Sequence, residues 1–177
     1  RDRSGTAEQK VHDFYRAFLD VDAINKAGIA PASAGLEAIT AAQTHADIAT
    51  LMGRPDLGLD TPVNVGITVD DKNPDRYIVG IGQSGLGLPD RDYYLKKDAQ
   101  FVEIRQKYRA HIERMLGLAQ EPNVAKQAQT VLDIETKIAQ KHWPVEKRRE
   151  RDLTYNLRTR AQLDGLAHPG QRQGERH

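Results

Sequence analysis

The sequence has 177 residues, of which 38% are hydrophobic, 29% are charged and 6% are aromatic. This length and balance suit one globular domain or a large part of one. The net charge of +1 gives no general attraction to nucleic acid or to membrane surfaces. The absence of cysteine excludes a disulfide framework and a thiolate metal site. Apolar runs are short, and neither a membrane-spanning segment nor an export signal is visible.

The first predicted helix follows a capping box formed by Thr6 and Gln9. Gly28 and Pro31 are expected to end this helix. Its apolar residues recur at helical spacing and are expected to form one buried stripe. The stripe comprises Val11, Phe14, Tyr15, Phe18 and Leu19.

Several further helices are predicted along the chain. Thr44 and Asp47 have the spacing of a helix N-terminus. Two long helices are expected over about 98–116 and about 122–143, the second of them ending before a proline. A short terminal helix begins at a second capping box, Thr159–Gln162.

Between these helices the apolar period changes from 3.6 to 2. Two alternating runs flank a turn at Asp70–Asp75, which predicts an antiparallel hairpin over about 63–83. The predicted fold is therefore mainly α, a helical lobe of about five to seven helices with one β-hairpin. The apolar strand residues are Val63, Val65, Ile67, Val69, Tyr77, Val79 and Ile81.

No residue pattern indicates a catalytic metal site. A helical zinc pair needs two ligands four residues apart and a glutamate directly after the first. After His111, the glutamate is Glu113, one place too late, and Met115 occupies the second ligand position. Pro144 interrupts the helix after His142. The sequence therefore predicts no catalytic residue and no metal ligand.

Three further motifs that can mark a functional site were considered, and none of them indicates one here. The segment Gly80–Gly85 matches G-x-G-x-x-G, but Leu86–Pro89 follows where a phosphate-binding helix would have to start. No G-x-S-x-G nucleophile elbow is present. In the charged segment 141–152, acidic residues alternate with basic ones, and Trp143 is its one side chain able to stack on a base. These observations predict no cofactor site and no nucleic-acid partner.

Two specific blocks carry a resemblance to a known family: Asp70-Asp71-Lys72-Asn73, and Leu86-Gly87-Leu88-Pro89 followed by Arg91-Asp92-Tyr93-Tyr94. Several looser pieces occur as well, and all the blocks follow one another in the same order as in the family. From about Ala7 to Ala167 the chain therefore resembles the non-catalytic N-terminal part of the neprilysin and endothelin-converting-enzyme family of zinc metallopeptidases. We call all these pieces the signature blocks. The looser ones are Gln9-Lys10-Val11, Asp13-Phe14-Tyr15, Ile134-Glu135, Ile138-Ala139 and Tyr155-Asn156.

The resemblance implies a helical lobe that caps a thermolysin-like catalytic lobe and admits only small peptides. In that family, zinc and the catalytic glutamate belong to H-E-x-x-H and E-x-x-x-D motifs further along the chain. The H-E-x-x-H motif does not occur in this sequence. The resemblance therefore implies a fragment that is inactive alone, with zinc in the complete enzyme and its catalytic lobe as partner. Because it lacks cysteine, the chain is more similar to bacterial members of the family than to the disulfide-bonded animal ones. The resemblance also implies that the complete enzyme is exported to the periplasm or the outside.

Four expectations remain. Residues 1–167 form the lobe fragment, and residues 168–177 form a disordered or non-native tail. Tyr93 or Tyr94 is buried, while Arg91 and Asp92 brace the turn before them as a charged pair. Without its partner lobe, the chain keeps an exposed apolar face and can form a homo-oligomer. The alternative is a free-standing helical interaction module with no enzymatic role.

Overall fold

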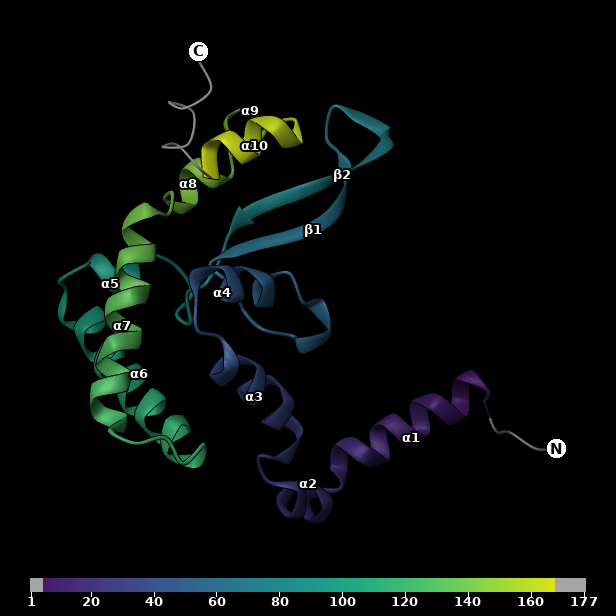
Figure 1. Ribbon diagram of the computed structural model, residues 1–177, viewed down its shortest axis with the longest axis vertical. Coiled ribbons are helices and arrows are strands. Elements are labelled where there is room, and N and C mark those ends of the chain that lie inside the picture. Colours follow the sequence, from purple (N-terminus) through teal and green to yellow (C-terminus); the bar gives the residue numbers. More distant parts are fainter. Residues whose placement is uncertain (1–4, 168–177) are drawn as a thin grey trace. The chain divides into compact units, whose positions relative to one another are not determined.

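The structure is a computed structural model that describes residues 5–167. The chain forms two compact units: the part up to Thr61 with Ala110–Ala128, and Pro62–Arg109 with the part from Gln129 onward. The described residues form seven helices of seven residues or more, three single-turn helices and one two-stranded sheet (Figure 1). The prediction of a mainly α fold with one hairpin is confirmed. The predicted tail, 168–177, lies outside the described residues.

The first unit contains a series of short helices. The predicted N-terminus at Thr44 is confirmed as a reciprocal capping box: the Thr44 hydroxyl accepts from the Asp47 N–H at 3.1 Å, and the Asp47 carboxylate accepts from the Thr44 N–H at 2.8 Å. Both bonds satisfy N–H groups that a helix start leaves unpaired. The helices are α1 (Ala7–Leu19), α2 (Val21–Ala27), α3 (Ser33–Ala41) and α4 (His45–Met52), with 3₁₀ turns at Ala30–Ala32 and Pro55–Leu57.

The first predicted helix is in fact two helices. Asp20 leaves helical geometry, and its side chain accepts from the Ala23 N–H at 2.9 Å, which starts α2. The predicted capping box at Thr6 is only half formed. Its hydroxyl accepts from the Gln9 N–H at 3.2 Å, but the Gln9 side chain donates to Asp13 at 2.7 Å instead of returning to Thr6. A glutamine side chain has a competing acceptor one turn further along the same face.

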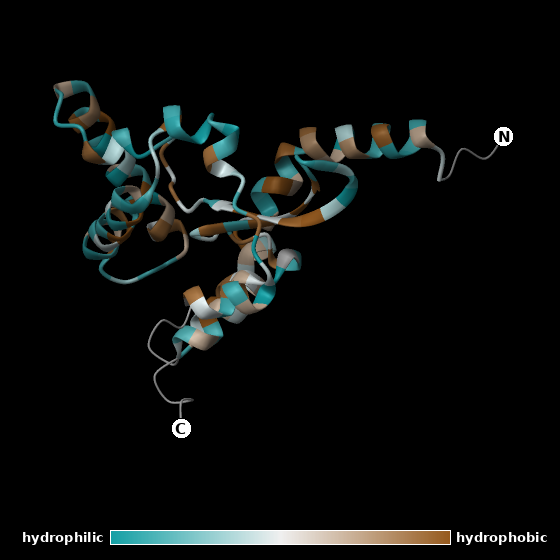
Figure 2. Cartoon of the chain, turned by 90° about the horizontal axis from the view of Figure 1, so that it is seen from above, coloured by the Kyte–Doolittle hydropathy of each residue, from teal (hydrophilic) through white to brown (hydrophobic). Residues whose placement is uncertain are grey.

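The apolar stripe of α1 is not buried as expected. The side chain of Phe14 is 75% exposed and that of Phe18 is 70% exposed. The stripe is visible as brown segments along α1 in Figure 2. Within the first unit, no described element covers these side chains.

The second unit contains the hairpin, and the long helices α6 and α7 contribute to both units. The capping box at Thr159 is confirmed, because Thr159 and Gln162 exchange hydrogen bonds of 2.8 and 3.3 Å. No described helix has the length and apolarity to cross a membrane. The elements are β1 (Val63–Asp70), β2 (Asn73–Gln83), α5 (Asp92–Leu95), α6 (Ala99–Leu118), α7 (Val124–Lys141), α8 (Val145–Arg148), α9 (Arg151–Thr154) and α10 (Arg160–Ala167).

The hairpin follows the predicted alternation but turns more tightly than expected. β1 and β2 pair antiparallel with Ile67 opposite Val79, and the turn itself is only Asp71 and Lys72. The register shifts after Val69, so that Pro74, Asp75 and Arg76 have no partner on β1. This bulge bends β2 back toward Asp70.

Candidate functional site

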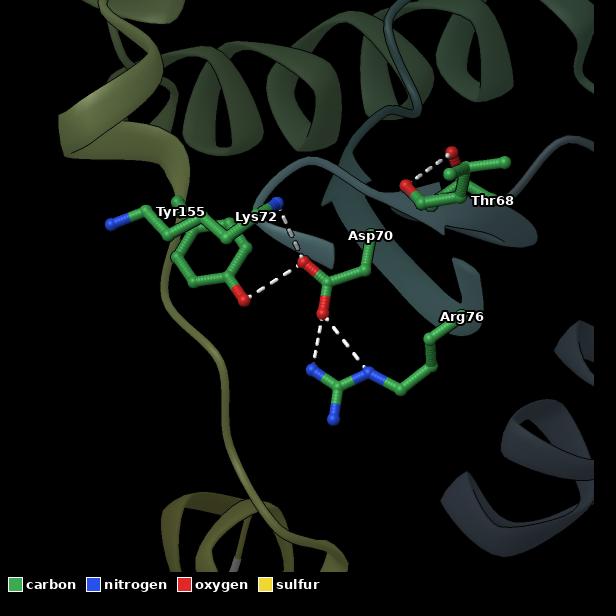
Figure 3. Close-up of polar contacts among 6 residues, drawn as sticks. Thr68, Asp70, Lys72, Arg76 and Tyr155 are labelled. Carbon is green, nitrogen blue, oxygen red and sulfur yellow. Dashed lines mark hydrogen bonds and ion pairs between the residues drawn. The ribbon is translucent and has the colours of Figure 1, made fainter. Parts of the chain in front are cut away.

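The first signature block surrounds a buried carboxylate at the tip of the hairpin. Asp70 is 1% exposed and is the one polar side chain recorded as buried in the described chain. Its Oδ1 accepts from the Lys72 N–H and from the Tyr155 hydroxyl, both at 2.9 Å. Its Oδ2 accepts from the Arg76 guanidinium, with 3.1 Å to Nε (Figure 3). We call Asp70, Lys72, Arg76 and Tyr155 the Asp70 cluster.

Each member of the Asp70 cluster is placed by a local feature. The tight turn directs the Lys72 N–H at the carboxylate, and the β2 bulge lets Arg76 reach back to it. Tyr155 comes from the segment after α9, and Lys72 Nζ lies 4.6 Å from the centre of its ring. The cluster therefore ties the hairpin tip to a segment 85 residues further along the chain.

The donors of the Asp70 cluster stabilise the ionised carboxylate. Hydrogen bonds from Arg76, then from the Lys72 N–H and the Tyr155 hydroxyl, lower the pKa of Asp70 to about 2. The same contact raises the pKa of Tyr155, because its proton is held by the carboxylate. At neutral pH the cluster pairs a buried, fully hydrogen-bonded carboxylate with a half-exposed guanidinium, and this arrangement has a structural function.

The second signature block forms an irregular turn that ends in α5. Gly85 adopts a φ of 84°, a conformation that favours glycine, and the next helix begins only at Asp92. The G-x-G-x-x-G match therefore lacks the helix N-terminus that a dinucleotide site requires. The Asp92 N–H donates to the Asp90 side chain at 2.8 Å, which initiates this helix.

The hydroxyl of a buried tyrosine holds this turn against the two long helices. Tyr94 is 5% exposed, as expected for one of the two tyrosines. Its hydroxyl accepts from the Leu88 N–H at 2.9 Å and donates to Glu135 Oε2 at 2.8 Å. The Tyr108 hydroxyl donates to Glu135 Oε1 at 3.0 Å. We call Tyr94, Tyr108 and Glu135 the Glu135 cluster. Burial is the main cause that raises the pKa of Tyr108 to about 12, and it also raises the pKa of Tyr94.

Gly87 gives the Glu135 cluster its close packing. A Cβ at this position would lie 1.9 Å from the Tyr108 hydroxyl oxygen and 2.7 Å from its ring carbon Cζ. The Tyr108 ring cannot move away freely, because its hydroxyl is bonded to Glu135. The Leu-Gly-Leu-Pro sequence therefore needs a glycine at its second position for packing.

The expected charged pair between Arg91 and Asp92 is absent. Arg91 Nε donates to the Ala139 carbonyl at 3.3 Å, and Asp92 pairs with Lys96 at 2.8 Å. Adjacent residues at a helix start point in different directions, whereas residues four apart share a face. Arg91 still braces the turn, but it does so against the backbone of α7.

Sequence reasoning missed the polar role of Tyr108, which lies within the long helix predicted over about 98–116. A tyrosine on the apolar face of such a helix needs a partner for its hydroxyl, and that requirement was the available signal. It also placed Glu135 and Tyr155 in separate signature blocks without linking them to Tyr94 and Asp70.

The described residues do not offer a zinc site. No group of three or more His, Asp or Glu side chains lies close enough together, anywhere in residues 5–167, to hold a metal ion. The acidic groups at the two clusters are occupied by hydroxyl and guanidinium donors. The donor sets therefore do not fit a catalytic zinc ion, which needs three protein ligands and an open position.

The ordered signature blocks and the mainly helical fold define a domain of the neprilysin-like metallopeptidase class. Residues 1–171 match the N-terminal region of peptidase family M13, and the chain belongs to this family. The match extends past Ala167 into the region after the last described helix.

Curated relatives and solved structures agree with this assignment. The chain is 39% identical to endothelin-converting enzyme 1 of Cavia porcellus over 106 residues, which is 59% of the chain and 14% of that protein. It is 30% identical to human endothelin-converting enzyme-like 1 over 148 residues, 76% of the chain and 19% of that protein. An inhibitor complex of the Mycobacterium tuberculosis zinc metalloprotease Zmp1 matches 90% of the chain and 25% of its own, with a TM-score of 0.81 and 40% identity. The chain thus spans a quarter or less of these proteins.

Replacement of Gly87 by alanine tests the packing of the Glu135 cluster. We expect Gly87→Ala to lower the free energy of unfolding by about 1–3 kcal/mol, because the new methyl group must displace Tyr108 from Glu135. The matched control is Gly117→Ala in α6, where a Cβ meets no atom within 4 Å. This control is expected to be neutral or stabilising by up to ~1 kcal/mol. Urea unfolding followed by circular dichroism measures both, and equal stabilities for the two variants would contradict the prediction.

The pKa of Asp70 predicts how stability depends on pH. The pKa of Asp70 in the folded chain, about 2, lies below its ordinary value of 3.8, so the carboxylate stabilises the folded chain above about pH 4. This contribution is lost as the pH falls from about 4 to about 2. We expect Asp70→Asn to have a lower Tm at pH 7 and a smaller further loss of Tm between pH 4 and pH 2. Asp75→Asn, at an exposed carboxylate of the same bulge, is the control and should keep the wild-type profile. If the Tm of Asp70→Asn depended on pH as the wild-type Tm does, the predicted contribution of Asp70 would be ruled out.

Proposed function

We propose that this chain is a non-catalytic scaffold of an M13 zinc metallopeptidase and is inactive alone. The observation that carries the proposal is membership of the M13 family. The chain matches the family over most of its own length but covers only 14% to 25% of the related proteins. The lack of a fitting donor set in the described residues supports the non-catalytic role. In the complete enzyme, the chain forms part of the lobe that limits substrates to small peptides.

The two clusters fit this scaffold role. Each joins segments far apart in sequence through hydrogen bonds to a carboxylate: Asp70 with Tyr155, and Tyr94 with Glu135. Charge-assisted bonds of this kind fix geometry strongly. A lobe that limits substrate size needs a rigid wall, because a flexible one would admit larger peptides.

The alternative proposal is a free-standing helical interaction module. The exposed stripe of α1 favours it, since a large exposed apolar surface marks an interaction site. The two proposals differ in the partner that they require: the remainder of an M13 chain in the first, an independent protein in the second.

The scaffold proposal predicts an absence of zinc chemistry. After incubation with zinc and dialysis, the purified chain should retain far less than one zinc per chain, and it should not cleave quenched fluorescent peptides. Zmp1 is the positive control for both measurements. One tightly bound zinc per chain, together with peptide cleavage that a chelator abolishes, would refute the proposal.

The exposed α1 stripe predicts self-association of the isolated chain. Light scattering over a dilution series should show a homodimer or higher oligomer that dissociates on dilution. Phe14→Lys should shift this equilibrium toward the monomer, because it places a charge in the stripe. Asp13→Lys, at an exposed position on the opposite side of α1, is the control and should associate as wild type does. A monomer at every concentration would exclude this use of the stripe.

A further inference from the structure

A polar cavity of about 190 Å³ lies between the turn before α5 and the end of α7, within the second unit. Hydrogen bonds join its two walls. The Gln83 side chain accepts from the Trp143 N–H at 2.8 Å and donates to the Trp143 carbonyl at 3.3 Å. The Ser84 carbonyl accepts from His142 Nε2 at 3.1 Å. These bonds fix the walls in place, so the cavity is formed before a ligand enters it.

Two arginines line this cavity and retain donors that the described residues do not use. Arg91 Nε donates to the Ala139 carbonyl, and the two terminal amino groups of Arg91 have no partner within residues 5–167. The Ala139 carbonyl also accepts from the His142 N–H, so its acceptor capacity is filled. The exposed Arg148 side chain forms no hydrogen bond or ion pair with the described chain. Both guanidinium groups can therefore donate to a bound anion.

The charged side chains of the lining attract anions. Arg91 and Arg148 carry two positive charges against the one negative charge of Asp90, which gives a net charge of +1. His142 adds no charge at neutral pH. Burial is the main cause that lowers its pKa; the Ser84 carbonyl acts in the opposite direction, and the charges of Arg148 and Arg91 lower the pKa further. A small anion is therefore attracted into this cavity by its charge.

Asp90 determines which anion fits the cavity. This half-buried carboxylate accepts from the Asp92 N–H through Oδ1 at 2.8 Å, and its Oδ2 has no partner among the described residues. An ionised carboxylate oxygen can only accept hydrogen bonds. A sulfate ion has no proton at neutral pH, so Asp90 would repel it. Inorganic phosphate keeps at least one P–OH group at this pH, and that group can donate to Asp90.

We propose that this cavity binds inorganic phosphate, whose ionised oxygens accept from Arg91 and Arg148 and whose P–OH group donates to Asp90 Oδ2. Arginine suits this contact, because its planar guanidinium presents several N–H groups to phosphate oxygens. A phosphomonoester fits less well, since it loses its last P–OH proton at about pH 6 and is mostly a dianion at pH 7. The inference is independent of the proposed scaffold function, because it concerns a site within the second unit alone.

Trp143 gives the test a local readout, because it is the single tryptophan of the chain and lines the cavity. Phosphate is titrated at pH 7 and constant ionic strength, followed by tryptophan fluorescence and by calorimetry. We expect saturable binding with a Kd of about 1 mM or tighter. Sulfate, acetate and glycerol 3-phosphate should each bind at least about tenfold more weakly than phosphate.

Three variants, each checked for wild-type circular dichroism, test the roles of the side chains. Arg148→Gln should weaken phosphate binding by at least about tenfold, because it removes one of the two guanidinium groups. Arg149→Gln is the matched control: this exposed neighbour does not line the cavity and should keep the wild-type affinity. Asp90→Asn should raise the affinity for sulfate to within about twofold of that for phosphate, because an amide can donate to an unprotonated oxygen.

Several results would overturn the proposal. The first is an absence of saturable phosphate binding by calorimetry. The second is a wild-type affinity in Arg148→Gln, or an equal loss in Arg149→Gln, because phosphate would then bind elsewhere or respond only to overall charge. The third is sulfate, acetate or glycerol 3-phosphate binding as tightly as phosphate in the wild-type chain, which would show a site without the proposed selection by Asp90.

Discussion

The second unit depends on one buried charge. The Asp70 carboxylate has almost no contact with solvent and is stable there only because the Arg76 guanidinium, the Lys72 N–H and the Tyr155 hydroxyl all donate to it. An unpaired carboxylate in this position would be strongly unfavourable. The hairpin turn, the β2 bulge and the segment after α9 must therefore form together.

The Glu135 cluster applies the same principle to a second pair of distant segments. The turn before α5 has few backbone hydrogen bonds of its own, and the Leu88 N–H is satisfied by the Tyr94 hydroxyl. That hydroxyl is held by Glu135, 41 residues away on α7. In both clusters, side-chain oxygens accept hydrogen bonds from backbone N–H groups of irregular segments. This explains why polar and glycine residues outnumber apolar ones in the two specific signature blocks.

The apolar core of the described chain is small by comparison. Five apolar residues of the described chain are buried, whereas the stripe of α1 and the alternating apolar side chains of the β1–β2 hairpin are exposed. Large exposed apolar faces are unusual for a self-sufficient domain.

Local signals in the sequence determined the helices and strands. Period 2 placed the hairpin, and capping boxes at Thr44 and Thr159 placed helix starts, because these features depend on residues within one turn of each other. The break at Asp20 was missed, since an aspartate inside an apolar stripe can either continue a helix or cap the next one. The order of the signature blocks gave the family, which the comparisons confirmed.

Only the tertiary structure decided which side chains meet. No local rule links Asp70 to Tyr155 or Tyr94 to Glu135, because their contacts depend on how distant segments pack. The sequence suggested a pair between Arg91 and Asp92, yet each found a different partner once α5 and α7 were in place. The exposure of the apolar faces was likewise invisible to periodicity, which reports that residues share a face but not what covers it.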